Sequence, residues 1–323
     1  MNHLLLLGAG FSRNWGGWLA DEALEYLLGA RRINVPLRQL LIKHKRQGGF
    51  EAALAELLEE RSPAGRREPE LLVRFQEAVS QMFADMDTAF AAVPFEWSNQ
   101  IKQQVAPFLT RFDAIFTLNQ DLLLERHYHN DNVSLMSNGK WSGWSIPGMQ
   151  RQGSDSPPLT NPNLDMMVPL SDSDFEVAVN SQPYFKLHGS SNWFASATDN
   201  VMVIGGNKQP SIDRYRILKF YSQQFHEYLN RPNTRLMVIG YGFGDNHINN
   251  MIVNAANVGG LSIFLIDPMG IDVVDKNQNA TIYHPDAMAE ALWPKIIGAS
   301  RRPLSATFSI DVVEHNKVMQ FFV

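Results

Sequence analysis

The chain has 323 residues, 45% of them hydrophobic, so it is long enough to bury a large core as one elaborated domain or two. Its formal net charge of −5 provides no overall basic surface of the kind that nucleic-acid-binding proteins carry. Cysteine is absent, which excludes disulfides, thiolate nucleophiles and cysteine-ligated zinc.

Short apolar runs predict buried strands of a parallel sheet, each followed by polar or glycine-rich residues. They are Leu4–Leu7, Ala114–Thr117, Tyr184–Leu187, Arg235–Ile239 and Ser262–Ile266, with a weaker strand expected at Ala306–Val313. Helical patterns lie between them, at Trp18–Leu28, Glu51–Glu60 and Glu70–Met86. Strands that alternate with helices predict an α/β fold, a Rossmann-like doubly wound parallel sheet, in a single domain over residues 1–323.

Two stretches do not fit the sheet. Residues 31–105 have a wholly helical pattern, which predicts a helical insertion over the ligand-binding end of the sheet. Residues 131–180 are rich in Ser, Asn, Asp, Pro and Gly and predict a long irregular insertion. No apolar run reaches the roughly 18 residues of a membrane helix, so we expect a soluble, cytoplasmic protein.

The residues that follow each predicted strand nominate a binding site, because ligands of open α/β sheets bind beyond the carboxyl ends of the strands. The first strand runs into Gly8-Ala9-Gly10-Phe11-Ser12, a turn typical of phosphate-binding loops, although Arg13 replaces the third glycine of the dinucleotide fingerprint. The later strands are followed by Asn119 and Asp121, by His188 and Gly189, by Gly240 and Tyr241, and by Asp267. Together these groups suit a dinucleotide.

Each group also has a purely structural interpretation. Asn119 and Asp121 are typical helix caps, and a lone histidine such as His188 is more often a hydrogen-bonded structural residue. Asp267 fits a plain strand terminus as well as the acidic group that holds ribose hydroxyls in dinucleotide sites. The joint occurrence of these residues at strand ends favours the functional interpretation.

Several blocks resemble signatures of the sirtuin superfamily, in the right order. They are Gly8-Ala9-Gly10-Phe11-Ser12, Thr117-Leu118-Asn119-Gln120-Asp121 and Lys186-Leu187-His188-Gly189-Ser190. A fourth block, Val238 to Ile248, is similar to one in bacterial sirtuin-like proteins of anti-phage defence systems, which are largely NAD-consuming enzymes. The resemblance therefore implies that NAD+ is bound as a substrate.

Departures from the family pattern narrow this expectation. Protein-deacylating sirtuins typically carry a four-cysteine zinc module, whereas this chain has no cysteine, so no zinc is expected, and the sequence assigns no residues to a metal site. They also carry Gly-Ile-Pro-Asp-Phe-Arg where this chain has Gly16-Gly17-Trp18-Leu19-Ala20-Asp21. The resemblance thus favours an NAD+ hydrolase (NADase) over a deacylase.

The resemblance implies cleavage of the nicotinamide–ribose bond through an oxocarbenium-like state. Asn119 would orient the ribose or the attacking water, His188 would bind a ribose hydroxyl and act as a general base that titrates near neutrality, and Asp121 would support the site. The glycine turn, with Ala9, Phe11 and Ser12, would hold the pyrophosphate. Gly189, Gly240, Tyr241 and Asp267 complete the expected NAD-binding set, with Gly240 and Asp267 beside the adenosine half.

The resemblance also implies partners. Such enzymes often work as homo-oligomers, with a HerA-type hexameric ATPase or another sensor that releases their activity, and they deplete NAD+ in anti-phage defence. We expect this chain to be the effector subunit of such a complex. The apolar end Met319-Gln320-Phe321-Phe322-Val323 is either a docked strand or a subunit contact.

Other classes of function remain as alternatives. A non-catalytic subunit that binds NAD or ADP-ribose would keep the glycines and Asp267 but would not need Asn119 and His188. A nuclease subunit is disfavoured by the acidic balance, and His127, His129 and Asp131 are better explained as a solvated helix end than as metal ligands. A serine hydrolase lacks its Gly-x-Ser-x-Gly elbow.

Overall fold

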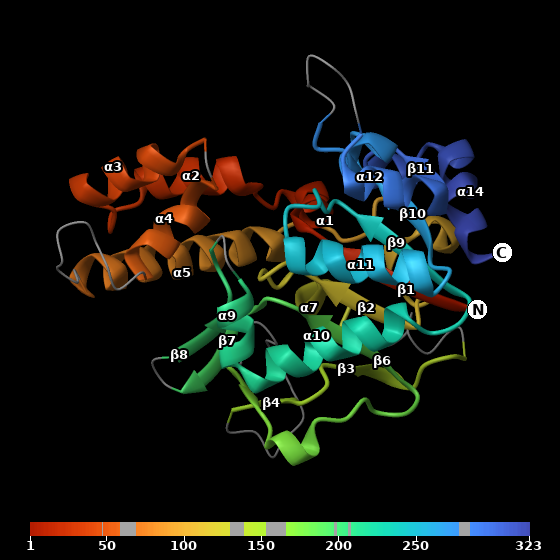
Figure 1. Ribbon diagram of the computed structural model, residues 1–323, viewed down its shortest axis with the longest axis horizontal. Coiled ribbons are helices and arrows are strands. Elements are labelled where there is room, and N and C mark those ends of the chain that lie inside the picture. Colours follow the sequence, from red (N-terminus) through yellow and green to blue (C-terminus); the bar gives the residue numbers. More distant parts are fainter. Residues whose placement is uncertain are drawn as a thin grey trace.

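A seven-stranded parallel sheet forms the centre of the molecule (Figure 1). The computed structural model describes residues 1–46, 48–58, 69–129, 139–152, 166–196, 199–205, 208–277 and 285–323. The strand order is β11-β10-β9-β1-β2-β6-β3. The strands are β1 (Asn2–Leu7), β2 (Ala114–Thr117), β3 (Gly143–Ser145), β6 (Ser181–Lys186), β9 (Thr234–Ile239), β10 (Ser262–Ile266) and β11 (Ile296–Ser300).

This order confirms the Rossmann-like doubly wound sheet. The strands β2, β6 and β3 lie on one side of β1, and the chain then returns to form β9, β10 and β11 on the other side. The order therefore reverses between β1 and β9, which is where open α/β sheets bind their ligands. The predicted strands at residues 4–7, 114–117, 184–187, 235–239 and 262–266 all lie in this sheet, with ends that differ by three residues at most.

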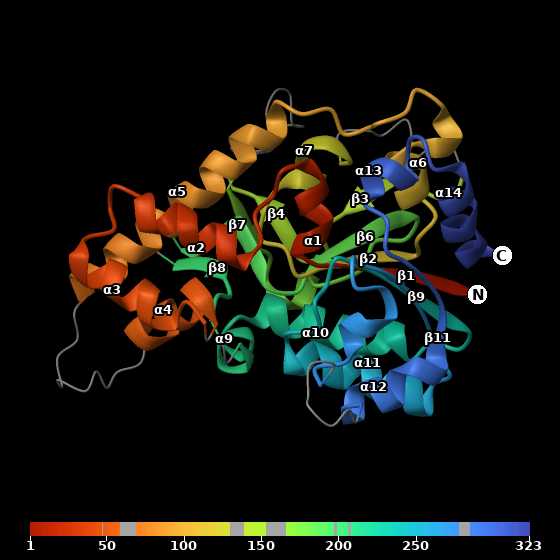
Figure 2. The same cartoon turned by 90° about the horizontal axis from the view of Figure 1, so that it is seen from above.

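The continuous apolar runs are explained by burial on both faces. Leu4, Leu5, Leu6 and Leu7 are all at most 1% exposed. Figure 2 shows α10 (Arg216–Leu229), α11 (Asn246–Val258) and α12 (Ala287–Leu292) on one face of the sheet. The other face carries α1 (Ala9–Ser12), α6 (Val105–Leu109), α7 (Leu123–His127) and α13 (Leu304–Thr307).

The expected helical insertion is helical from α3 (Val35–His44) through α4 (Gly49–Leu58) to α5 (Pro69–Ala91). With α2 (Ala20–Gly29), these helices extend beyond the carboxyl ends of the strands (Figure 1). The expectation of a wholly helical segment is wrong after Ala91, where the chain forms only a 3-10 turn at Ile101–Gln103 before α6. The helix α6 begins at Val105, where the Glu96 carboxylate accepts the N–H groups of Val105 and Ala106 and so caps the new helix.

The stretch expected to be irregular, residues 131–180, contains short strands where it is described. They are β3, β4 (Met149–Arg151) and β5 (Met167–Pro169); residues 131–138 and 153–165 lie outside the described part of the chain. A second sheet has the order β4-β5-β7-β8, with β7 (Gly189–Ser196) and β8 (Asp199–Met202). Strands of three residues are too short to show an alternating pattern, so the sequence did not reveal them.

The C-terminal strand expected at Ala306–Val313 is wrong. This segment contains α13 and the start of α14 (Val312–Met319), and the last strand of the sheet is β11 instead. The Asp311 carboxylate accepts the Glu314 N–H group and so caps α14. The chain end is docked, as a 3-10 turn rather than a strand, because Arg235 donates to the carbonyls of Phe321 and Val323.

Within the described part of the chain, no helix combines the length and the apolar character needed to span a membrane.

Candidate functional site

The carboxyl ends of five neighbouring strands lie in register along one edge of the sheet. Leu7 is the register partner of both Thr117 and Ile239, Thr117 pairs with Lys186, and Ile239 pairs with Ile266. The residues that follow these positions are therefore brought together, as the sequence predicted. They surround a cavity of about 1140 Å³.

Glycines let the turn after β1 pack against the turn after β9. A Cβ at Gly8 would lie 2.5 Å from the Gly240 carbonyl oxygen, and one at Gly240 would lie 2.3 Å from the carbonyl carbon of Gly10. Gly240 also has φ +63°, a conformation that favours glycine. The N–H groups of Gly8 and Gly10 donate to the Ile239 and Gly240 carbonyls. Gly8 and Gly10 thus join the two loops at the point where the strand order reverses. Their N–H groups are bonded to these carbonyls and are not directed at a phosphate.

Asn119, Ser12 and Asp121 form a hydrogen-bonded chain at the cavity. The Asn119 amide nitrogen donates to the Ser12 hydroxyl over 2.9 Å, and this hydroxyl in turn hydrogen-bonds the Asp121 carboxyl. Asn119 and Asp121 line the cavity, whereas Ser12 is only 2% exposed. Ser12, expected at the pyrophosphate, is therefore placed where it orients Asn119.

Buried charges lie behind this chain. Lys186 is fully buried and its ammonium contacts Glu125 at 2.7 Å and the Asp121 carbonyl at 2.5 Å. Burial raises the pKa of Asp121 and Glu125, and Lys186 opposes both shifts. Asp121 Oδ1 also accepts the Leu123 N–H group at the start of α7. Asp121 therefore has the structural role expected of a helix cap and also lines the cavity.

Asp87 connects the helical insertion to the same loop. It lies on α5 and its carboxylate accepts the Leu122 N–H group over 3.1 Å. Burial, and next the charge of Asp121, raise the pKa of Asp87 to about 7. A titratable group of the insertion is therefore bonded to the residue that follows Asp121.

His188 follows β6, lines the cavity and is 1% exposed. Burial, followed by the charges of Lys208 and His247, lowers its pKa well below the ordinary 6.5, against a hydrogen bond with the Leu118 backbone. The expectation that His188 titrates near neutrality is therefore wrong, because desolvation disfavours the imidazolium. His188 is a neutral donor and acceptor at neutral pH.

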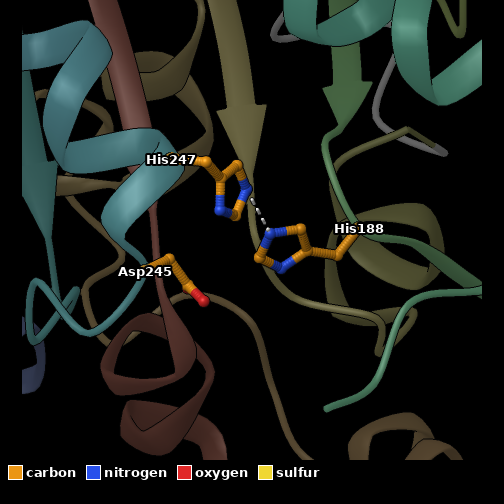
Figure 3. Close-up of side chains that lie close together, drawn as sticks. All are labelled: His188, Asp245 and His247. Atoms are coloured by element: carbon orange, nitrogen blue, oxygen red, sulfur yellow. Dashed lines mark hydrogen bonds between the residues drawn. The ribbon is translucent and has the colours of Figure 1, made fainter. Parts of the chain in front are cut away.

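A second histidine faces His188 across the site (Figure 3). Its Nε2 atom, on His247 at the start of α11, lies 3.2 Å from Nε2 of His188. The helix cap Asp245 adds a carboxylate, and the ligand atoms of the three side chains lie within 4.8 Å of one another. The sequence placed Asp245 and His247 in a signature block but did not assign them to the site.

An ion-pair network connects this group to the helical insertion. The Lys208 ammonium lies 2.8 Å from Asp245 and 3.4 Å from Glu51 on α4. Burial lowers the pKa of Lys208, but the two carboxylates outweigh it and raise that pKa overall. Lys208 and Glu51 also line the cavity. Both residues lie outside the signature blocks and remote from the strand ends, so no sequence signal pointed to them.

Arg301 and Arg302 are further residues that sequence reasoning missed. They follow β11 and line the cavity on the side of Asp267 and Gly240. The sequence predicted the last strand at Ala306–Val313, so it placed no strand end before these arginines. Recognition of β11 would have placed them at a strand end.

The remaining predicted residues divide into two groups. Ala9, Tyr241 and Asp267 line the cavity, although the Tyr241 hydroxyl donates to Asn249 over 2.8 Å and Asp267 Oδ1 accepts the Met269 N–H group. Phe11 and Gly189 are buried beside the cavity rather than lining it, among the described residues. Gly189 has φ +74°, and a Cβ there would lie 1.9 Å from the Val201 carbonyl oxygen, so pairing of β7 with β8 requires glycine.

The chain is similar to known proteins of one family. The model of the SIR2-like domain matches residues 113–283, just over half of the chain, and these include Asn119, His188 and the block from Val238 to Ile248. Among solved structures, that of Sir2Tm bound to a propionylated peptide aligns with 98% of this chain and 93% of that chain, at 9% identity and a TM-score of 0.40. No curated protein matches the sequence.

Proposed function

This chain belongs to the SIR2-like domain family, a membership consistent with NAD-dependent chemistry, and on that premise we propose that it is an NAD+ glycohydrolase. It would cleave the nicotinamide–ribose bond to give nicotinamide and ADP-ribose. The observation that carries the proposal is that Asn119, Asp121 and His188, from two separate strand ends, converge on one cavity at the reversal of strand order.

The cavity suits an extended nucleotide. Its volume of about 1140 Å³ exceeds the roughly 300–1,000 Å³ of pockets for drug-sized ligands. One part of the cavity wall consists of residues that follow β10 and β11, namely Asp267, Arg301 and Arg302. In the sheet these two strands lie on the other side of β1 from β2 and β6, which carry the catalytic candidates. The arginines offer cationic partners for a pyrophosphate, and Asp267 an acceptor for ribose hydroxyls.

Asn119 is oriented so that it can bind the nicotinamide ribose or the attacking water. Its amide nitrogen is engaged by Ser12, so the orientation of the amide is set and its carbonyl oxygen can accept from a ribose hydroxyl or from water. Water then attacks the anomeric carbon as the bond to nicotinamide breaks, and nicotinamide leaves as a neutral base. Orientation by Asn119 supplies the positioning that such a reaction needs.

His188 is neutral at neutral pH, so its imidazole can accept a proton, and because desolvation disfavours the imidazolium it also releases that proton readily. The proton lost by the attacking water, or by a ribose hydroxyl, passes to His188 and from there to solvent. Asp245 lies beside it, with its carboxylate 2.8 Å from the Lys208 ammonium. This carboxylate offers a negative charge to the positive charge that develops on the ribose.

We further propose the biological setting implied by the resemblance: NAD+ depletion in anti-phage defence, as the effector subunit of a complex. The expected partners are further copies of this chain and a HerA-type hexameric ATPase or another sensor. The fourth signature block supports this assignment, since it is similar to the corresponding block of defence proteins.

Nicotinamide release tests the proposed chemistry. The purified chain is incubated with NAD+, and release is compared between the wild type, Asn119→Ala, His188→Ala and the control Asn316→Ala on the exposed surface of α14. We expect release by the wild type and the control and a loss of roughly 100-fold or more in the two site variants. The same variants expressed in cells, with NAD+ levels measured, include any partner that the cell supplies.

Two results would contradict the proposal. Undiminished release by both site variants would exclude Asn119 and His188 as the catalytic groups. Stoichiometric binding of NAD+ without turnover, in the presence of the assembled partners, would identify the chain as a non-catalytic nucleotide-binding subunit.

A further inference from the structure

The group of His188, His247 and Asp245 has the composition of a transition-metal site (Figure 3). Two imidazoles and one carboxylate are ligands typical of Zn²⁺, Co²⁺ or Fe²⁺, whereas Mg²⁺ and Ca²⁺ prefer oxygen ligands alone. Each of the three side chains offers one ligand atom, and all these atoms lie within 4.8 Å of one another.

The two histidines are already placed at the spacing of metal ligands. Two nitrogens bound to one zinc ion at about 2.1 Å in a tetrahedral site are roughly 3.4 Å apart. Nε2 of His188 and Nε2 of His247 are 3.2 Å apart. An ion beside both nitrogens therefore needs only a small opening of this contact, together with an approach of the Asp245 carboxylate.

The supporting elements are rigid. His188 comes directly after the central strand β6 and is 1% exposed, while Asp245 caps the 13-residue helix α11 and His247 lies in its first turn. The Asn249 amide donates to the Phe243 carbonyl, and the Tyr241 hydroxyl accepts the Asp245 N–H group, which holds the loop before α11. The three ligands are thus positioned by the fold rather than by mobile loops.

We propose that His188, His247 and Asp245 bind a divalent transition-metal ion of the zinc type. His188 and Asp245 line the cavity, so the remaining coordination positions are open to water or to an oxygen of a ligand. The ion coordinates Nε2 of His188, a residue that the proposed function places in the NAD+ site. If that function holds, on which this one consequence rests, the metal ion and NAD+ therefore compete for binding.

Lys208 sets the affinity of this site. Its ammonium lies 2.8 Å from Asp245 and competes with a cation for that carboxylate. Glu51 lies 3.4 Å from the same ammonium, so Lys208 has a second partner to which it can shift when the ion binds. Replacement of Lys208 by methionine removes the competing charge, and the variant is therefore expected to bind metal more tightly than the wild type.

Titration of the whole chain with Co²⁺ in the absence of NAD+ tests the proposal. We expect saturable visible absorption bands from one Co²⁺ per chain, which Zn²⁺ abolishes by displacement. His247→Ala is expected to lose the bands, and Asp245→Asn to bind Co²⁺ at least ~10-fold more weakly. The matched control is His226→Ala, which removes an exposed histidine of α10 and is expected to leave Co²⁺ binding unchanged.

The proposal is overturned if the wild type shows no saturable bands, or if the bands persist in both His247→Ala and Asp245→Asn. Thermal melting shows whether each variant is folded. If His247→Ala fails to fold, the other two variants test the proposal. Asp245→Asn is expected to bind Co²⁺ more weakly than the wild type and Lys208→Met more tightly, and equal Co²⁺ affinities of these two variants would refute the proposal. Because Co²⁺ absorption is read without NAD+, this result is independent of whether the chain cleaves NAD+.

Discussion

The side-chain amide of Asn119 donates a hydrogen bond of 2.9 Å to the hydroxyl of Ser12, which lies 107 positions earlier in the chain. This bond connects the loop after β2 to the helix after β1. Ser12 also hydrogen-bonds Asp121, so the hydroxyl stands between the amide and the carboxyl. A residue that the sequence assigned to phosphate binding therefore positions the principal catalytic candidate.

Replacement of Ser12 by alanine tests this positioning. Ser12→Ala removes the acceptor of the Asn119 amide but adds no volume, so we expect kcat for nicotinamide release to fall by roughly 10-fold or more with KM little changed. Steady-state kinetics measure both constants. A rise in KM with unchanged kcat would instead return Ser12 to the role of a substrate-binding residue.

The contact between the glycine turns predicts a large loss of stability. In Gly240→Ala the new Cβ would meet the Gly10 backbone at 2.3 Å with φ at +63°, so we expect destabilisation of about 3 kcal/mol or more. Gly244→Ala is the matched control, because a Cβ at Gly244 meets nothing within 4 Å and this glycine also lines the cavity. Urea unfolding compares the two, and similar midpoints would contradict the close approach.

The buried ion pair of Lys186 and Glu125 predicts non-additive effects. Lys186→Met leaves the Glu125 carboxylate buried without its cation, at a cost of about 3–5 kcal/mol in the free energy of unfolding. The double variant Lys186→Met with Glu125→Leu removes both charges and is expected to be more stable than Lys186→Met alone. Urea unfolding of the cycle measures the difference, and a double variant that is less stable than the single one would refute it.

Asp87 predicts a pH dependence of stability. Its pKa is raised to about 7 in the folded protein, above the roughly 3.9 of an unfolded chain, so the folded state binds more protons between these values. The contribution of Asp87 to the free energy of unfolding therefore falls as the pH rises from about 4 to about 7. Asp87→Asn abolishes this fall while keeping an acceptor for the Leu122 N–H group.

Unfolding of the wild type and Asp87→Asn at about pH 5 and about pH 8 checks this sign. The variant is expected to gain stability relative to the wild type at the higher pH. Equal changes in the two proteins would show that Asp87 does not carry the dependence.

Much of the fold could be predicted from local sequence. The strand at Leu4–Leu7 is apolar at every position because helices cover both faces, and the turn after it needs glycine because another backbone packs there. β11 was missed because Gly298 interrupts its apolar run; a Cβ there would meet the ring of Phe264 at 2.5 Å. Missing this strand also hid Arg301 and Arg302, which lie at its carboxyl end.

The candidate site was predictable only where its residues follow strands. Asn119, Asp121 and His188 lie at strand ends, and register alone brings those ends to one edge. Glu51 reaches the cavity from the helical insertion, and Lys208 reaches it from the start of α9 (Gln209–Arg214). The sequence around either residue does not predict the ion pair between them.

The sequence by itself determined the class of fold, the edge of the sheet that carries the site and the kinship with SIR2-like domains, because apolar periodicity and short signature blocks are local properties. Only the tertiary structure decided which partners these residues have: Ser12 beside Asn119, His247 beside His188, and Lys208 between Asp245 and Glu51. Hydrogen bonds and desolvation act over a few ångströms in space, whatever the separation along the chain. The neutral state of His188 therefore follows from how the chain packs, and no motif records it.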